Sequence, residues 1–303
     1  MQSGIGRRGV LFPGFELKRV AGEGAEINLR IGGKGPALLL LHGYPQTHAM
    51  WHRIAPKLAE DFTVVCADLR GYGDSGKPAT TPDHAPYSFR AMAADMVKAM
   101  AALGFDQFCL AGHDRGARVS HRLTLDHQAR VKKVALMDIV PTLHLYENID
   151  QQVATGYYHW FWLIQPEPFP EKMIGSDPEF YLRKKTGHWS GASFKFDEDA
   201  MAEYLRCFSK PETIHASCED YRAAAGIDLV HDRADRDAGK RVTCPMLVLW
   251  GSKGLMAKAY DVLGAWRDRV NGPLDGHAVN SGHFLPEEAP DETYAALIKF
   301  LKA

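Results

Sequence analysis

The sequence lacks two features that would point to a membrane or to nucleic acid. Its 36 basic and 37 acidic residues give a formal net charge of −1, so no overall field attracts nucleic acid or an anionic membrane surface. No apolar run approaches the roughly 20 residues that a membrane-spanning helix needs, and the opening stretch, MQSGIGRRGVLFPGF, has no signal-peptide core. We therefore expect a cytoplasmic protein without a membrane or nucleic-acid partner, in which any preference for an anion is local.

Cysteines are few and follow no metal-binding pattern. Such scattered thiols are typical of a reduced, cytoplasmic protein rather than of a disulfide scaffold. We therefore expect no metal site. The five cysteines, an odd number without metal-ligand spacing, are Cys66, Cys109, Cys207, Cys218 and Cys244.

What the sequence does contain is an alternation of strand and helix patterns. At 303 residues, with 46% hydrophobic and 24% charged residues, the chain can bury one large core. Apolar stretches predict strands at 15–20, 26–31, 37–41, 62–67, about 107–112, 131–137, 246–250 and near 279. Helices are predicted at 50–60, 89–103, about 115–127, 258–270 and 291–302. This alternation predicts an α/β fold with a mostly parallel central sheet flanked by helices.

Between two parts of this core the alternation stops. Residues 141–222 are strongly aromatic and contain the run Tyr-Tyr-His-Trp-Phe-Trp at 157–162. We interpret 141–222 as a helical cap inserted between core segments 1–140 and 223–303, roofing a pocket over the sheet. Most of its rings are expected to pack the interior of the cap itself.

The central motif is Gly112-His113-Asp114-Arg115-Gly116, where an apolar strand turns abruptly into a helix. This small-x-nucleophile-x-small pattern is typical of a nucleophile elbow, in which the middle residue stands on a strained turn above the sheet edge. Most elbows carry Ser, but this one carries Asp114. A carboxylate needs no deprotonation at neutral pH, so Asp114 could displace a leaving group from an sp3 carbon and form an alkyl ester.

A second loop, His42-Gly43-Tyr44-Pro45, directly follows the predicted strand at 37–41. A loop leaving a central strand can present a backbone N–H toward the elbow and form half of an oxyanion hole. We assign the two N–H donors to Tyr44 and Arg115.

Candidates for the base and its orienting acid follow later strands. His283 comes after the last strand, in the order nucleophile, acid, histidine. No carboxylate follows the strand at 246–250, whereas Asp138 follows the strand at 131–137. Asp138 could therefore accept one imidazole N–H of His283 and leave the other ring nitrogen able to take a proton from water.

Two arginines stand immediately after the nucleophile. Arg115 and Arg118 are three residues apart, so both can lie on one helix face. Cations in a first helical turn oppose the macrodipole, and such a broken local rule beside a nucleophile suggests a function. The two guanidinium groups could receive a small carboxylate. Alternatively, Arg118 pairs with a structural acid such as Asp138 or Asp68.

Taken together, these motifs resemble the α/β-hydrolase superfamily over nearly the whole chain. The aspartate nucleophile resembles the epoxide hydrolase and haloalkane dehalogenase branch, and Gly-His-Asp-Arg-Gly-Ala-Arg with Tyr-His-Trp in the cap is similar to the fluoroacetate dehalogenases. That resemblance implies hydrolysis of haloacetate to glycolate and halide, a homodimer, and no metal or organic cofactor. It further implies that Arg115 and Arg118 hold the substrate carboxylate and that His159, Trp160 and Tyr221 surround the departing halide.

The leaving group gives a physical reason for such a halide site. Fluoride is strongly hydrated, so expelling it into a dry pocket requires several N–H or O–H donors. An imidazole, an indole and a phenol could supply three, and Trp189 is a possible additional pocket wall.

Two other functions remain open. An epoxide hydrolase would share Asp114 and His283 and would use cap tyrosines, such as Tyr157, Tyr158 or Tyr204, to protonate the opening oxygen. The arginine pair has little use beside a neutral epoxide. A non-catalytic ligand receptor on the same scaffold is the other alternative, and the intact Asp, Asp, His set argues against it.

Overall fold

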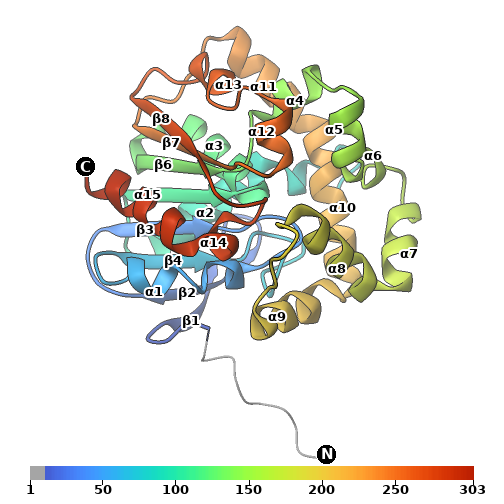
Figure 1. Ribbon diagram of the computed structural model, residues 1–303, viewed down its shortest axis with the longest axis horizontal. Helices are drawn as coiled ribbons and strands as arrows, with labels where there is room; N and C mark the ends of the chain where they lie inside the picture. The colour runs from blue at the N-terminus through green and yellow to red at the C-terminus, as the bar shows by residue number, and fades with distance from the viewer. Residues whose placement is uncertain (1–10) are drawn as a thin grey trace, which may run out of the picture.

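The computed structural model describes residues 11–303, so most of the N-terminal stretch without a signal-peptide core lies outside the described residues. An eight-stranded sheet runs through the molecule in the order β1-β2-β4-β3-β5-β6-β7-β8 (Figure 1). Its strands are β1 (Glu16–Ala21), β2 (Glu26–Gly32), β3 (Ala37–Leu41), β4 (Thr63–Ala67), β5 (Phe108–His113), β6 (Val131–Met137), β7 (Met246–Gly251) and β8 (Leu274–Val279).

All strands from β3 onward are parallel, while β1 and β2 pair antiparallel at one edge. Every residue of β3 and of β5 is buried, as a central parallel strand covered on both faces requires. Because β3, β5 and β6 are neighbours in register, their carboxyl ends lie side by side. The loops that follow these strands therefore meet at one edge of the sheet. The predicted mostly parallel α/β fold is confirmed.

Helices cover both faces of this sheet. Helix α2 packs against α3 on one face, and α1 packs against α15 on the other (Figure 1). The shorter elements η1 (His48–Trp51), η2 (Ala85–Tyr87) and η3 (Gln128–Arg130) are single 3-10 turns. The helices outside the cap region are α1 (Ala55–Leu58), α2 (Phe89–Ala102), α3 (Arg115–Asp126), α12 (Leu255–Ala259), α13 (Gly264–Arg267), α14 (Leu285–Glu288) and α15 (Pro290–Lys302).

Eight helices and no described strand separate β6 from β7. Figure 1 shows α5 to α9 gathered to one side of the sheet, beside the long α10. Since α10 continues past residue 222, the expected boundary of the cap at that position lies inside a helix. The eight are α4 (Thr142–Glu147), α5 (Gln151–Gly156), α6 (His159–Trp162), α7 (Phe169–Ser176), α8 (Pro178–Trp189), α9 (Glu198–Phe208), α10 (Pro211–Ala225) and α11 (Ile227–Asp237).

Two predicted helices are broken in the structure. The stretch 258–270 is not one helix: α12 ends at Ala259 and α13 begins at Gly264. Between them the Asp261 side chain accepts the Gly264 N–H at 3.0 Å, which competes with a continuous helix. The stretch 50–60 contains the end of η1 and the one-turn α1, which carries Pro56 in its first turn. Among residues 11–303 no helix is long and apolar enough to cross a membrane.

Candidate active site

Asp114 occupies the turn between β5 and α3. Its backbone has φ 49° and ψ −115°, a region that non-glycine residues rarely adopt. The turn is possible because Gly116 lets α3 approach β3: a Cβ there would lie 2.4 Å from the Leu41 and His42 carbonyl oxygens. Asp114 is 5% exposed, so its carboxylate stands in a largely closed site at the sheet edge. The strained turn predicted for the elbow is present.

The loop after β3 reaches the nucleophile directly. The Tyr44 N–H donates to Asp114 Oδ1 at 2.9 Å. A Cβ at Gly43 would lie 2.5 Å from the Asp114 Cβ, so only glycine permits this approach. Arg115 begins α3, where backbone N–H groups have no partner within the helix. The Tyr44 N–H is therefore at the Asp114 carboxylate, and the Arg115 N–H is the first of the helix N–H groups that follow it.

His283 and Asp138 meet at the same edge. His283 Nδ1 lies 2.5 Å from Asp138 Oδ2, and Asp138 Oδ1 accepts the Gly251 N–H at 2.9 Å. Nδ1 must donate in this bond, so the neutral ring carries its lone pair on Nε2. That atom has no hydrogen-bond partner among the described residues and lies 3.9 Å from Asp114 Oδ2. A base next to the nucleophile, oriented by a buried acid, is the arrangement needed to activate water.

The charges in the site favour an ionised nucleophile. Burial alone would raise the pKa of Asp114, but the neighbouring His283, His113, Arg118 and Arg115 outweigh it and lower that pKa. Burial likewise opposes protonation of His283, yet the hydrogen bond and charge of Asp138 raise the pKa of His283. Asp114 is therefore a carboxylate across the neutral pH range, ready to attack without losing a proton.

The two arginines differ in what they bind. Arg115 is fully buried and its Nε and Nη2 donate to Asp220, so it offers Nη1 alone rather than a whole free fork. Arg118 Nη1 donates to the Val140 carbonyl and to Thr142 Oγ1, both at 3.0 Å, and its Nε has no partner. Among residues 11–303 no acid pairs with Arg118.

The acids that could have neutralised Arg118 are otherwise engaged. Asp138 bonds His283, and Asp68 accepts from His48 and Asn28. The alternative in which one of these acids neutralises Arg118 is therefore wrong. A buried guanidinium without a carboxylate is costly unless an anion from solution reaches it.

Aromatic residues of the cap lie against the catalytic groups. The rings of His159 and Trp160 lie 5.4 and 5.8 Å from the Tyr221 ring, and Trp189 lies 4.7 Å from His159 and 5.4 Å from His283. The Arg115 guanidinium lies 4.2 Å from the centre of the Tyr221 ring and that of Arg118 4.5 Å from Trp160. The four cap aromatics named from the sequence thus form one cluster with the arginines and the base.

This cluster concentrates polar atoms that have no hydrogen-bond partner among residues 11–303. Most buried polar atoms in native proteins are hydrogen-bonded, so a group of unsatisfied donors around one carboxylate marks a place for a polar ligand. Burial lowers the pKa of His159 well below its usual value, with the charge of Lys185 adding to this, so its ring is neutral. The unsatisfied atoms are Arg115 Nη1, Arg118 Nε, His159 Nδ1, Trp160 Nε1, Trp189 Nε1, Tyr221 Oη and His283 Nε2.

Comparison with known proteins agrees with this geometry. A family model described as the alpha/beta hydrolase fold matches residues 36–290. The chain belongs to the α/β-hydrolase family.

Relatives within the α/β hydrolases carry two kinds of name. A fluoroacetate dehalogenase from Burkholderia sp is 47% identical over 292 residues, covering 96% of this chain and 95% of that protein. A solved structure from Nostoc sp PCC 7120, described as an α/β hydrolase, has a TM-score of 0.92 and 57% identity, with 95% and 98% of the two chains covered. A Pseudomonas aeruginosa variant described as an epoxide hydrolase has a TM-score of 0.90 and 44% identity, with 96% of each chain covered.

Three further residues support this α/β-hydrolase site without having been singled out in the sequence. His113 Nε2 lies 2.7 Å from the His283 carbonyl oxygen, and the two rings are 4.5 Å apart. Asp220 binds Arg115, and the Tyr181 hydroxyl lies 2.9 Å from the Tyr44 hydroxyl. His113 was visible as the residue before the nucleophile. The other two depend on how the cap packs, which no local pattern reveals.

Other features of the chain do not compete with this site. Asp74, Glu203 and Cys207 lie close enough to bind a cation, but both carboxylates already pair with Arg206. All five cysteines are free thiols.

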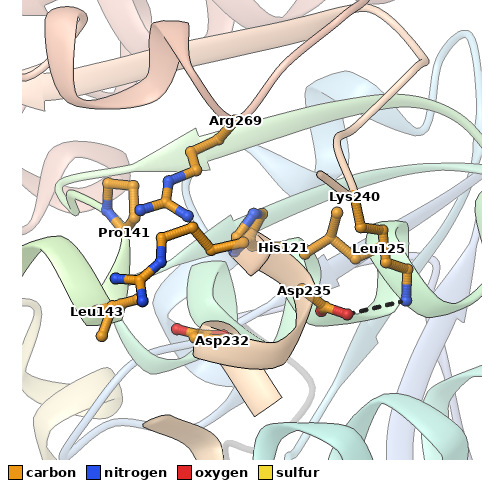
Figure 2. A pocket seen from close by; sticks show the side chains of 9 residues that line it. His121, Leu125, Pro141, Leu143, Asp232, Asp235, Lys240 and Arg269 are labelled. Carbon is orange, nitrogen blue, oxygen red and sulfur yellow. Dashed lines mark ion pairs between the residues drawn. The ribbon is translucent and has the colours of Figure 1, made fainter. Parts of the chain in front are cut away.

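The cavity shown in Figure 2 lies beside His121, Asp232 and Arg269, and none of the proposed catalytic groups lines it. Its volume of about 10 Å³ has room for about one water molecule, so it is too small for a substrate.

Proposed function

We propose that this α/β hydrolase removes halide from a small 2-haloacid, converting fluoroacetate or another haloacetate to glycolate through an ester on Asp114. The observation that supports this most is the buried Arg118 guanidinium, which has no carboxylate partner among residues 11–303. Together with Arg115 Nη1 it would receive the substrate carboxylate and hold the α-carbon against the nucleophile.

The first step is displacement of halide. Asp114 Oδ1 accepts the Tyr44 N–H, which leaves Oδ2 as the attacking atom. Oδ2 forms a bond to the α-carbon as the carbon–halogen bond breaks, and the electron pair leaves with the halide. The N–H and O–H groups of His159, Trp160 and Tyr221 would stabilise the charge that develops on the halide, because each lacks a protein partner.

The second step is hydrolysis of the ester. His283 Nε2 takes a proton from water, and the hydroxide attacks the carboxyl carbon of Asp114 while Asp138 stabilises the imidazolium. The Tyr44 and Arg115 N–H groups hold the oxyanion. Collapse breaks the ester, the imidazolium returns its proton to the glycolate oxygen, and Asp114 is left as the carboxylic acid. Loss of that proton to solvent restores the Asp114 carboxylate.

Epoxide hydrolysis is the competing proposal, since one related structure carries that name. Of the tyrosines considered for that reaction, Tyr204 donates to Glu287 at 2.9 Å. Tyr158 is 45% exposed to solvent, and its ring faces the Lys185 ammonium. Tyr157 remains, with its ring 5.3 Å from that of His159. An epoxide has no charge for the buried Arg118 guanidinium to bind, which favours the haloacid.

One set of assays separates these reactions. We expect halide release from fluoroacetate and chloroacetate and little diol from styrene oxide, with no activity in Asp114→Ala. Diol formation faster than halide release would refute the haloacid assignment. No turnover of any of the three would favour a ligand receptor.

A further inference from the structure

The cap contains a buried lysine that the proposed reaction does not use. Lys185, on α8, is 2% exposed, and its Nζ has no hydrogen-bond partner among the described residues. No carboxylate in residues 11–303 forms an ion pair with it. Burial without such a partner lowers the pKa of Lys185 to about 7. An ammonium in this position is costly, and a costly local arrangement beside an active site calls for a functional explanation.

Aromatic rings surround this ammonium. Nζ lies 3.5 Å from the centre of the Tyr158 ring, 5.1 Å from that of Trp189 and 5.7 Å from that of Tyr181. The negative ring faces attract the cation but accept few of its N–H groups. Trp189 Nε1 is also without a hydrogen-bond partner. Tyr158, Tyr181 and Trp189 thus form an aromatic cage around Lys185, in which the ammonium and the indole N–H have no acceptor among residues 11–303.

The caged ammonium lies between the catalytic pocket and an open groove. On the inner side, two cage rings contact His159, with centroid distances of 6.2 Å for Tyr158 and 4.7 Å for Trp189. On the outer side, Tyr158 and Tyr181 line a groove of about 750 Å³ between α6, α7 and α8. The rings around the Lys185 ammonium therefore belong both to the catalytic cluster and to the groove.

We propose that Lys185 forms a second halide site in the cap, on the route by which halide leaves the catalytic pocket. This inference rests on the dehalogenation proposed above. A monatomic anion needs only point contacts, which an ammonium and an indole N–H supply. A carboxylate is better matched by a planar guanidinium group, which Arg118 supplies in the catalytic cluster.

Bromide offers a direct probe, because its anomalous scattering locates it without any turnover. Crystals of the full chain soaked in bromide should show one ion at His159, Trp160 and Tyr221 and a second at Lys185 Nζ. Lys185→Met removes the charge and keeps an unbranched apolar side chain in the cage, so the fold should persist. Lys185→Arg keeps the charge, and Lys184→Met removes the exposed lysine next to it.

We expect Lys185→Met to lose the second bromide peak alone, while Lys185→Arg and Lys184→Met retain both. Chloride-35 line broadening in solution should fall in Lys185→Met and match wild type in Lys184→Met. A wild-type crystal without bromide at Lys185 would overturn the proposal, as would a peak that survives in Lys185→Met. Acetate in place of bromide would assign the site to substrate entry and overturn it as well. Failure of the wild type to release halide from haloacetate is a separate result, which would refute the dehalogenation itself.

Discussion

The catalytic carboxylates of the core and the donor groups of the cap differ in the hydrogen bonds that the protein makes to them. On the core side, Asp114 accepts the Tyr44 N–H, and Asp138 binds both His283 and Gly251. On the cap side, the three donors proposed to face the halide have no hydrogen-bond partner among residues 11–303. The catalytic carboxylates of the core therefore hold protein hydrogen bonds before any ligand binds, whereas these cap donors have none from the described residues. We infer that the core determines the reaction and that the cap determines which leaving group is tolerated.

The largest predicted effect comes from removing the proposed base, which separates formation of the Asp114 ester from its hydrolysis. His283→Asn should lower steady-state turnover by about a thousandfold, because hydrolysis of the ester loses its base. The first step needs no base, so the variant should still release about one equivalent of halide per site. Intact-protein mass spectrometry should then show Asp114 carrying a carboxymethyl group. A variant that releases no halide burst and carries no adduct would contradict this division.

A smaller loss of activity is expected when the arginine proposed to bind the substrate carboxylate is replaced. Arg118→Leu should lower kcat/KM for haloacetate by about 150-fold, or about 3 kcal/mol, the scale of a truncated buried charge pair. Thr142→Ala removes one hydrogen bond of Arg118 without its charge and should have a much smaller effect. Haloacetamides should be poor substrates of the wild type. Turnover of a haloacetamide as fast as haloacetate would show that Arg118 binds no carboxylate.

On the cap side, the expected losses depend on the halide. Trp160→Phe keeps the ring but removes an N–H donor, so defluorination should slow by about a hundredfold. Dechlorination should slow clearly less, because chloride is the weaker base and needs less stabilisation. Trp162→Phe, two residues further along α6, should change either rate by less than about twofold. Equal losses for fluoroacetate and chloroacetate in Trp160→Phe would indicate packing rather than halide binding.

The smallest expected effect is a shift in the pH at which turnover falls to half on the acidic side. Because the pKa of His283 is raised, the ring is protonated up to a pH above its ordinary value, and protonated His283 cannot act as a base. Turnover should therefore fall on the acidic side with a midpoint above 6.5. Asp138→Asn should move that midpoint to lower pH while the halide burst remains. A midpoint that stays in place would show that Asp138 does not stabilise the charged ring.

The core half of the site was predictable because its residues follow strands. Asp114, Asp138 and His283 each stand just after a parallel strand, and parallel strands end at one edge of a sheet. The order of motifs along the chain was enough to bring these residues together. The positive φ of Asp114 could also be expected from the glycines around it.

The cap half was less predictable because its contacts come from packing between short helices. That His159 and Trp160 lie beside Tyr221 was expected from resemblance alone, and the bond between Arg115 and Asp220 was not foreseen. Lys185 likewise has no local pattern that would mark it as buried. The prediction of one helix at 258–270 was wrong for a local reason, because the Asp261 side chain binds a backbone N–H between α12 and α13. The homodimer implied by the resemblance stays a prediction.

The central claim, that an oxygen of Asp114 is transferred to the product, is tested most directly by a single turnover in heavy-oxygen water. The account predicts unlabelled glycolate and one heavy oxygen in the peptide that carries Asp114, because the transferred oxygen comes from the aspartate and water restores it. Repeated turnover should then place the label in glycolate. Labelled glycolate from the first turnover, with an unlabelled Asp114 peptide, would show direct attack by water and contradict the account.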